Sequence, residues 1–218
     1  LTTLDVSKQS LSDELPFDIF GLPSLRVVAL QENMLSGDGL EGFSSLSGLE
    51  YLNLSSNVLS GQVPKTYGFL TSLKVLSLSN SGVNGSIPAE LGNCSDLQVL
   101  ELRGNNLIGQ IPKDFSRLSH LRTLDLGQNG LTGEIPENIS DCASLATLLL
   151  DSNHISGHIP ESLSRLSNLE KLNLSSNNLN GSIPSSLSLI SSLKYLNVSH
   201  NHLEGEIPEA LGSRFKDP

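Results

Sequence analysis

Residues 97–120 read LQVLELRGNNLIGQIPKDFSRLSH, and this stretch holds the pattern that decides the fold. The next block, residues 121–144, repeats the pattern in the same register, and so do the blocks before and after it. Leucine opens each block, at positions 1, 25, 49, 73, 97, 121, 145, 169 and 193, which sets a period of 24 residues. A period of this length indicates a solenoid, in which each repeat is a small unit that stacks on its neighbours.

Counted from that leucine, repeat positions 4 and 6 are also apolar in all nine blocks, as in Leu100 and Leu102. Two apolar residues with one other residue between them predict a short strand with one buried face. Identical strands at constant spacing are expected to stack into one parallel sheet. The residues between them, at positions 2, 3, 5, 7 and 8, are expected on the opposite, exposed face of this sheet.

Position 9 is Asn in seven of the nine repeats, with Gln9 and Ser81 as the exceptions. A stacked column of amides can donate to and accept from the backbone of the turns that leave the strands. Position 13 is Gly in every repeat after the first, which indicates a backbone position that suits glycine. Positions 15 and 16 read Ile-Pro or a close variant in eight repeats, which predicts short extended and turn segments with little room for long helices.

The composition narrows the classes of function. The chain of 218 residues has 13 Lys and Arg against 23 Asp and Glu, a formal net charge of -10. Nucleic-acid binding requires clustered basic residues, so this charge argues against it. The sequence has no apolar run near the roughly 20 residues that span a bilayer. Because it begins in mid-pattern, we interpret the sequence as an excerpt of a longer chain.

The chemistry of catalysis or metal binding has little support in the sequence. Cys94 and Cys142 both occupy position 22, where other repeats carry core leucines, so we expect two buried, inert thiols. They lie two repeats apart, roughly 10 Å, which exceeds the reach of a disulfide. His154 and His202 share position 10, but the same separation prevents them from binding one metal ion. We therefore expect no catalytic residue, no metal site and no cofactor.

The pattern LxxLxLxxNxLxGxIPxxLxxLxx resembles the plant-type leucine-rich repeat, and it covers residues 1–212. This resemblance implies an α/β repeat fold, mostly β: a right-handed solenoid of about nine repeats of 24 residues with a concave parallel sheet. Residues 213–218 are expected to begin a C-terminal flank. The paired-cysteine caps of the family are absent from both ends, which supports the excerpt interpretation.

Two departures from the pattern stand out. In the second repeat, Gly37 to Gly42 replace the expected Ile-Pro segment, so we expect an irregular outer edge there. A contact site for a partner is the alternative interpretation of this segment. In the ninth repeat, Arg214 occupies position 22, where a core residue is expected, and the pattern fades.

The resemblance also implies a function. It favours the extracellular recognition region of a plant receptor-like kinase or receptor-like protein at the plasma membrane, which signals by pairing with a co-receptor. A cytoplasmic Ser/Thr kinase would then lie outside this sequence, and the region itself would have no enzyme activity. The partners would be a peptide, a small ligand or a partner ectodomain. The alternatives are a secreted inhibitor of a cell-wall polygalacturonase, which would use the same face, and a passive scaffold.

The candidate binding residues are the variable residues expected on the concave face. Repeats 3, 8 and 9 carry mostly Ser and Asn there, whereas repeats 5 to 7 carry charged and apolar residues. We define these as the concave cluster: Glu101, Arg103, Arg122, Asp125, Gln128, Leu149 and Asp151. The backbones of Glu101 and Asp125 should lie about 4.8 Å apart on adjacent strands, and their carboxylates are either neutralised by Arg103 and Arg122 or available to a ligand. A weaker second patch combines Tyr51 and Lys74 with Arg26, Gln31 and Glu32.

Seven Asn-x-Ser sequons occur, at Asn53, Asn84, Asn93, Asn138, Asn173, Asn180 and Asn197. Several arise because the favoured strand sequence is LNLSSN, so repetition explains them without any modification. If the protein is exported, we expect glycans at Asn138, Asn93 and Asn84, with Asn138 preferred because position 18 should point outward. Glycans at Asn53, Asn173 and Asn197 would mask the concave sheet.

Overall fold

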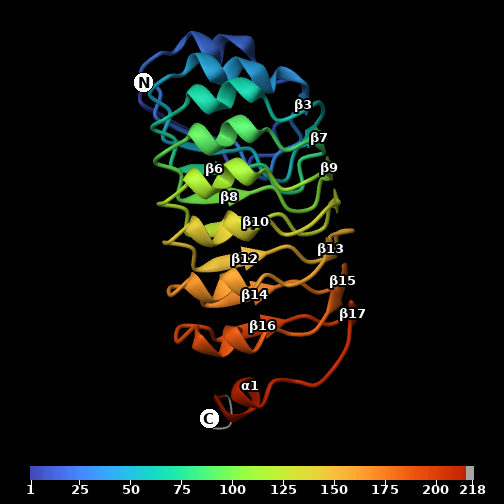
Figure 1. The fold of residues 1–218 in the computed structure, drawn as a ribbon. Coiled ribbons are helices and arrows are strands. Elements are labelled where there is room, and N and C mark those ends of the chain that lie inside the picture. Colours follow the sequence, from blue (N-terminus) through green and yellow to red (C-terminus); the bar gives the residue numbers. More distant parts are fainter. Residues whose placement is uncertain (215–218) are drawn as a thin grey trace.

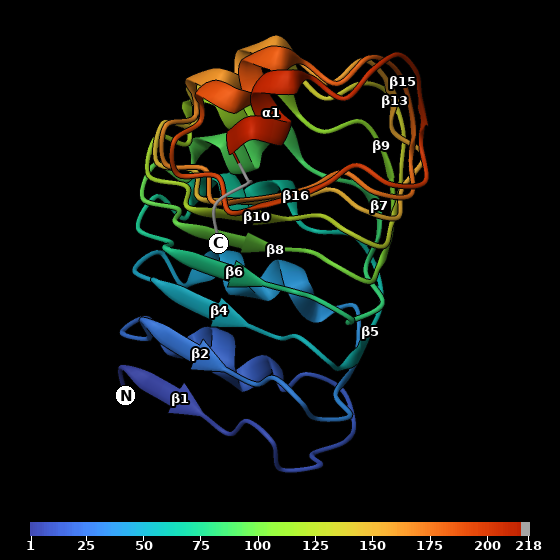
Figure 2. The same ribbon diagram turned by 90° about the horizontal axis from the view of Figure 1, so that it is seen from below.

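A computed structural model describes residues 1–214 of the chain, and the side chains of residues 1–213. The repeats stack along one axis as a solenoid, with the first repeat at one end and the last at the other (Figure 1). One short strand from each repeat joins a nine-stranded, all-parallel sheet in sequential order, which we name the concave sheet. Its strands are β1 (Thr3–Asp5), β2 (Val27–Ala29), β4 (Tyr51–Asn53), β6 (Val75–Ser77), β8 (Val99–Glu101), β10 (Thr123–Asp125), β12 (Thr147–Leu149), β14 (Lys171–Asn173) and β16 (Tyr195–Asn197). Figure 2 shows the earlier strands succeeding one another along one wall of the coil.

The register of the sheet follows the 24-residue period. Leu124 of β10 lies opposite Leu100 of β8 and Leu148 of β12, so equivalent residues of successive repeats are direct neighbours. All three leucines are fully buried. Positions 4 and 6 therefore form the continuous core that the apolar pattern predicts, and the predicted solenoid with its parallel sheet is confirmed.

The asparagine column at position 9 joins the turns that follow the strands. The Asn153 amide donates to the carbonyl oxygens of Leu126 (3.0 Å) and Leu150 (3.1 Å). Its Oδ1 atom accepts the backbone N–H of Leu131 at 3.0 Å. Asn153 is buried, so each of these bonds satisfies a backbone group that water does not reach. The predicted amide column is confirmed, and it links adjacent repeats.

On the side opposite the concave sheet, each of the first eight repeats forms a short 3-10 helix. Proline precedes seven of these helices, and its backbone there is extended, as with φ -62° and ψ 129° at Pro112. The helices are η1 (Phe17–Gly21), η2 (Gly39–Ser45), η3 (Lys65–Phe69), η4 (Ala89–Asn93), η5 (Lys113–Arg117), η6 (Glu137–Asp141), η7 (Glu161–Arg165) and η8 (Ser185–Leu189). The exception without proline is η2, which has 7 residues where the others have 5. The predicted irregularity of the second repeat is thus a longer helix that begins where Ile-Pro is missing.

Short strands also line the edge of the solenoid that follows the concave sheet. They form three small parallel sheets, and isolated parallel bridges, such as the one between Gln62 and Asn84, connect these sheets from repeat to repeat. These strands are β3 (Ser36–Gly37), β5 (Val58–Leu59), β7 (Asn84–Ser86), β9 (Asn106–Gly109), β11 (Gly130–Leu131), β13 (Ser156–Gly157), β15 (Asn178–Gly181) and β17 (His202–Leu203). We name this side the exit edge, and the opposite side, where the chain enters the sheet, the entry edge.

The described part of the chain ends in the helix α1 (Glu209–Arg214), whose Leu211 is buried. This helix crosses the predicted boundary between residues 212 and 213. The rest of the predicted flank, residues 215–218, and the side chain of Arg214 lie outside what the structure describes. Within residues 1–214, no helix has both the length and the apolar character that crossing a membrane requires.

Candidate functional site

The concave cluster contains a network of charges centred on Arg103. The Arg103 guanidinium donates to both carboxylate oxygens of Asp151, at 3.1 and 2.6 Å, and to Oδ1 of Asp125 at 3.1 Å. Asp151 lies 48 residues further along the chain and only 6% of its surface is exposed. The hydrogen bond to Asp151 is the main cause that raises the pKa of Arg103, so the guanidinium stays charged. Arg103 therefore lies across three repeats and serves as a cross-link within the protein.

Gly127 leaves the space in which the Arg103 side chain reaches Asp151. It occupies position 7 of the intervening repeat, and a Cβ atom added there would lie 2.2 Å from Nη1 of Arg103 and 2.9 Å from Oδ1 of Asp151. With any residue other than glycine, the guanidinium of Arg103 would have to shift from this position. The sequence analysis did not identify Gly127, although it is the only glycine at position 7 in the nine repeats.

Glu101 is the acidic residue of the cluster that this network leaves without a cation. Ser77 donates a hydrogen bond to its Oε2 atom at 2.8 Å, and Ser55 in turn contacts Ser77 at 2.6 Å. Asp125 lies directly beside Glu101 in the sheet register. Arg122 forms no ion pair with any residue in the range 1–214, so only one part of the neutralisation hypothesis is correct: Arg103 pairs with Asp125. A carboxylate oxygen of Glu101 remains available to a ligand.

The remaining members of the cluster surround these charges. Leu149 lies opposite Asp125 in the register and is half-buried. Gln128 is exposed, in the left-handed backbone region with φ 53°. Arg122 is exposed at the entry edge, beside a shallow hollow of about 310 Å³ that Ser144, Ala146, Asn168 and Glu170 also line. The structure thus brings together Glu101, Arg103, Asp125, Leu149 and Asp151 and places Arg122 and Gln128 at the margins.

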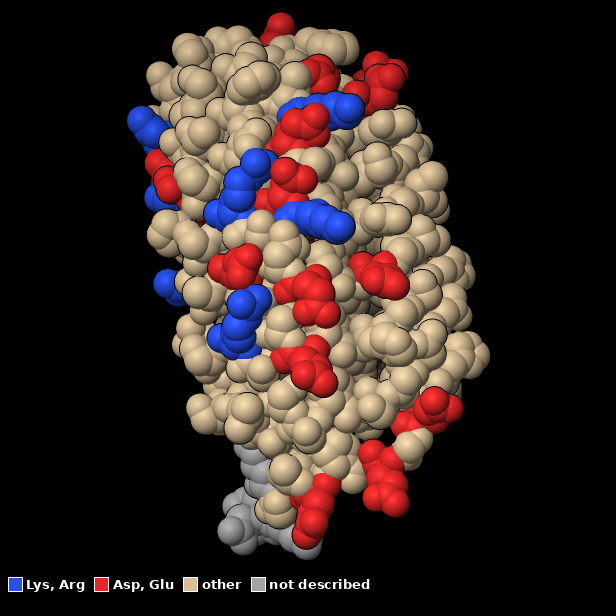
Figure 3. All heavy atoms as spheres, viewed as in Figure 1, with Lys and Arg blue, Asp and Glu red and all other residues tan. Residues whose placement is uncertain are grey.

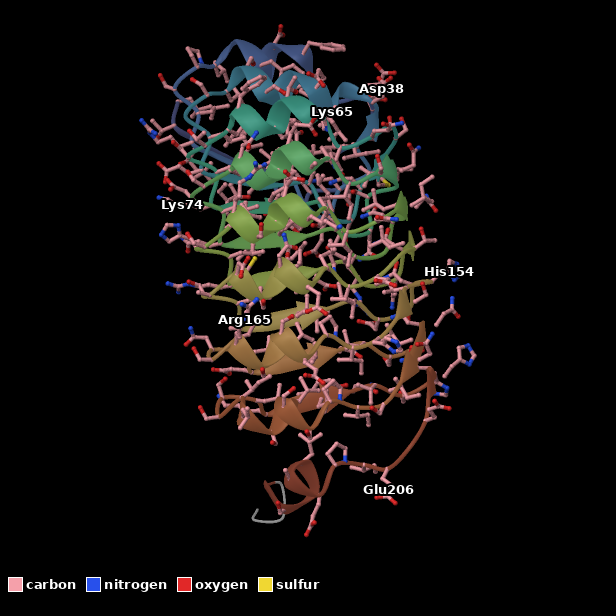
Figure 4. All side chains as sticks on the ribbon, viewed as in Figure 1. Asp38, Lys65, Lys74, His154, Arg165 and Glu206 are labelled. Carbon is pink, nitrogen blue, oxygen red and sulfur yellow. The ribbon has the colours of Figure 1, made fainter. Side chains whose placement is uncertain are left out.

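The second patch is separate from the cluster. Lys74 and Arg26 both pair with Glu50, at 2.7 and 3.4 Å, and the hydrogen bond from Lys74 is the main cause that lowers the pKa of Glu50. Figure 4 shows Lys74 at one edge of the solenoid, opposite His154. Tyr51 lies on the concave sheet, where its hydroxyl accepts a hydrogen bond from Asn53 at 3.1 Å. This patch is a chain of exposed ion pairs, which contribute little to stability.

Of its other members, Glu32 pairs with Lys8 at 3.4 Å, and the side-chain oxygen of Gln31 is buried without a hydrogen-bond partner in the described residues.

The two cysteines are free and fully buried, as predicted. Each thiol donates to a backbone carbonyl, Cys94 to Tyr67 at 3.2 Å and Cys142 to Phe115 at 3.1 Å. Burial raises the pKa of Cys94 to about 11 and that of Cys142 to about 12, which keeps both thiols protonated and unreactive near neutral pH. In the part of the chain that the structure describes, no three His, Cys, Asp or Glu side chains gather to hold a metal ion.

The three predicted glycosylation sites differ in their surroundings. Asn84 and Asn93 are exposed. Asn138 is half-buried, and its amide donates to the carbonyl oxygen of Lys113 at 3.0 Å. The side chain of Asn138, at position 18, is therefore partly buried and held by a hydrogen bond.

Outside the concave sheet, the charged side chains that the structure describes show no comparable arrangement. On the face that Figure 3 shows, Lys and Arg are interleaved with Asp and Glu across the middle repeats. The ion pairs on the 3-10 helices, such as Arg117 with Asp114 at 3.0 Å and Arg165 with Asp141 at 3.5 Å, join exposed side chains. The partly buried network of Arg103 is thus specific to the concave sheet.

Comparison with known proteins connects this geometry to one family. A model described as "Leucine-rich repeat region" matches residues 73–215, and one described as "Leucine rich repeat" matches residues 1–59 and 23–83. A comparison with the sequences of curated proteins gave no match.

Among solved structures, the ectodomain of the receptor kinase GASSHO1/SCHENGEN3 from Arabidopsis thaliana, in complex with CASPARIAN STRIP INTEGRITY FACTOR 2, is 34% identical, with a TM-score of 0.96. The Arabidopsis receptor kinase HAESA, in complex with the peptide hormone IDA and the co-receptor SERK1, is 33% identical, with a TM-score of 0.77. A plant ice-binding protein is 30% identical, with a TM-score of 0.74. The matches cover 98%, 95% and 94% of this chain and 26%, 39% and 74% of the respective chains, so the sequence spans well under half of the two receptor chains.

Proposed function

Because this chain belongs to the leucine-rich-repeat family, we propose that it is part of the extracellular recognition region of a plant receptor-like kinase or receptor-like protein. It binds a peptide, a small ligand or a partner ectodomain through the concave sheet. Signalling then follows from pairing with a co-receptor at the plasma membrane. A cytoplasmic kinase domain belongs to the parent receptor kinase in this proposal, and this region contributes recognition only.

The observation that carries the proposal is the contrast between buried and exposed positions of one sheet. The buried positions are almost invariant, since they hold Leu or Val in all nine repeats, whereas the exposed positions change from repeat to repeat. A regular support with a variable surface suits the recognition of an extended partner, because each repeat contributes its own side chains to a continuous face. The relative HAESA is in complex with a peptide hormone and a co-receptor, and GASSHO1/SCHENGEN3 is in complex with CASPARIAN STRIP INTEGRITY FACTOR 2.

The chemistry of the concave cluster favours a partner that donates hydrogen bonds or carries positive charge. Glu101, Asp125 and Asp151 outweigh Arg103, so the four side chains sum to a charge of about -2. Arg103 is occupied by two aspartates and is not available to an anionic group. Leu149, beside Asp125, adds an apolar contact for the aliphatic part of a side chain.

The network also prepares the surface for binding. Two aspartates and one arginine that already hold one another lose little side-chain freedom when a partner docks. The polar chain from Ser55 through Ser77 fixes Glu101 in the same way. Rigid groups of this kind contribute affinity mainly by lowering the entropy cost of association.

The ice-binding relative shows that this fold supports other functions. Repetition of one side chain along the solenoid would suit an ordered surface such as ice, but the concave cluster has a different residue in each repeat. A secreted inhibitor of a polygalacturonase remains the alternative, because it would use the same face. Inhibition of purified plant polygalacturonases by the protein, measured as release of reducing sugar, would identify that alternative.

Affinity selection from a library of short random peptides tests the proposal. Peptides enriched on the protein should bind Glu101→Lys at least about tenfold more weakly, because the substitution reverses the charge of the free acceptor in the cluster. The matched control is Glu161→Lys, which makes the same charge change at an exposed position of η7. Equal loss of affinity in both variants, or none in Glu101→Lys, would contradict binding at the concave sheet.

A further inference from the structure

The seven sequons divide into two groups according to what their asparagine side chains do in the folded protein. We propose that Asn84, Asn93 and Asn180 carry N-linked glycans, and that these glycans leave the concave sheet free for partners. Asn180 was not among the expected sites, and Asn138 was preferred among them. The proposal rests on the export of the protein that the proposed function implies.

Asn84 and Asn180 occupy the same position, 12, in the fourth and eighth repeats, each within an Asn-Gly-Ser sequence. They lie in β7 and β15, which Figure 1 shows along the exit edge of the solenoid. Their backbones are fixed by pairing with the next repeat, Asn84 with Asn106 and Asn180 with His202. Both side chains are exposed, and their amides make no hydrogen bond within the described residues. A glycan at either site therefore displaces no contact of the fold.

Asn93 meets the same criteria on another surface. It is the last residue of η4, it is exposed, and its amide is likewise unbonded in the region 1–214. Its neighbour Cys94 is fully buried, so the fold separates the two adjacent side chains. The sequon at Asn93 thus presents its acceptor amide to solvent.

The sequons of the concave sheet are different, because their side chains take part in the sheet surface. Oδ1 of Asn53 accepts the backbone N–H of Ser55 at 3.0 Å, and its amide donates to Tyr51. Asn173 accepts from the backbone and the hydroxyl of Ser175, at 3.2 and 2.8 Å. Asn197 repeats the arrangement of Asn53 with Ser199 and Tyr195. A glycan at any of these three sites would cover the surface to which we assign binding.

Asn138 is intermediate between these groups. Its amide holds the carbonyl oxygen of Lys113 in the preceding repeat, at 3.0 Å. The sequon hydroxyl, Ser140, is 5% exposed, donates to the carbonyl of Glu137 at 2.9 Å and contacts the Arg165 guanidinium. A sugar on Asn138 would crowd this contact between repeats, so the folded protein disfavours the site that the sequence alone favours.

The modification joins the Nδ2 atom of asparagine to the anomeric carbon of the first sugar. The donor is a lipid-linked oligosaccharide; its bond from anomeric carbon to diphosphate oxygen breaks, and the lipid diphosphate leaves with the electron pair. The amide nitrogen loses one proton, and nothing is oxidised or reduced. Since four repeats separate Asn84 from Asn180, the two glycans would stand about 19 Å apart along the exit edge. A protein partner would then approach by the concave sheet, in whose strands none of the three sites lies.

Site occupancy in the protein secreted from plant cells tests this proposal. Enzymatic deglycosylation in ¹⁸O-labelled water converts each glycosylated Asn to an Asp that carries ¹⁸O. Mass spectrometry of the peptides then locates each labelled residue. We expect most molecules to be labelled at Asn84, Asn93 and Asn180, and few at the other four sites. Asn180→Gln should remove the mass of one glycan, whereas Asn178→Gln, an exposed non-sequon control in the same strand, should remove none.

An unlabelled Asn180, or labelling of Asn53, Asn173 or Asn197 equal to that of Asn180, would overturn the proposal. These outcomes are independent of the ligand. Labelling at the three expected sites without any peptide bound at the concave sheet would overturn the proposed recognition function and leave the glycan assignment standing.

Discussion

Gly127→Ala is the substitution that most sharply tests the network of the concave cluster. The added Cβ atom would lie 2.2 Å from Nη1 of Arg103, so the guanidinium must shift, and we expect this shift to break its contact with Asp151. Asp151 is 6% exposed and would be left as a buried carboxylate without its cation. Removing one partner of a fully buried ion pair costs about 3–5 kcal/mol. Because the Arg103 side chain is 26% exposed and can keep its contact with Asp125, we expect a loss of about 2–3 kcal/mol.

Urea unfolding followed by circular dichroism measures this loss, which corresponds to a fall in melting temperature of about 5–10 °C for a chain of this size. The matched control is Gly21→Ala, at a position where nothing lies within 4 Å of the new Cβ atom, and it should change stability by less than about 0.5 kcal/mol. In an Arg103→Ala background, Gly127→Ala should cost less than about 1 kcal/mol, because the displaced group is gone. An undiminished cost in that background, or a loss in Gly127→Ala no larger than in the control, would refute the role given to Gly127.

Three further predictions concern the repeat itself. Leu102→Asp places a charge at a fully buried position and should unfold several repeats, so a native circular-dichroism melt would contradict the assigned register. Asn153→Ala removes four hydrogen bonds to the backbone and should cost about 2–4 kcal/mol in urea unfolding. The control Asn178→Ala, at an exposed position in the next repeat, should cost less than about 0.5 kcal/mol. Cys94 and Cys142 should resist thiol reagents in the native protein and titrate as two thiols after denaturation, with no increase on reduction. Burial raises the pKa of Cys94 to about 11 and that of Cys142 to about 12, from the ordinary 9.0, so these thiols ionise at lower pH in the unfolded chain than in the folded protein. The contribution of the two thiols to the free energy of unfolding should therefore be complete below pH 9 and decline as the pH rises through 11 and 12. Constant stability in that range would contradict their burial.

The sequence predicts the fold well because its signals are local and repeated. The apolar positions 4 and 6, the Asn column and the Ile-Pro segments each fix one part of a repeat, and nine copies remove the ambiguity of any single copy. Even the irregular second repeat follows from the missing proline, since the helix η2 begins two residues earlier than in the other repeats.

The details of the site depend on contacts that no local pattern encodes. The pairing of Arg103 with Asp151 joins residues 48 positions apart, and it requires both a long side chain and the absence of one at Gly127. Adjacent-strand spacing predicts the neighbourhood of Glu101 and Asp125, but it does not say which cation pairs with which carboxylate. The state of the sequon amides is equally hidden, because the hydrogen bond of the Asn138 amide and the free amide of Asn180 depend on groups that the fold places around them.

Hydrogen–deuterium exchange of the protein with a selected peptide tests recognition by the concave sheet most directly. With a peptide bound at saturation, the account predicts slower exchange in β8, β10 and β12 and in the turns that follow them, with the 3-10 helices unchanged. Glu101→Lys should abolish that protection at the same peptide concentration. Protection confined to the 3-10 helices or to the exit edge, with β8, β10 and β12 unaffected, would contradict the central claim.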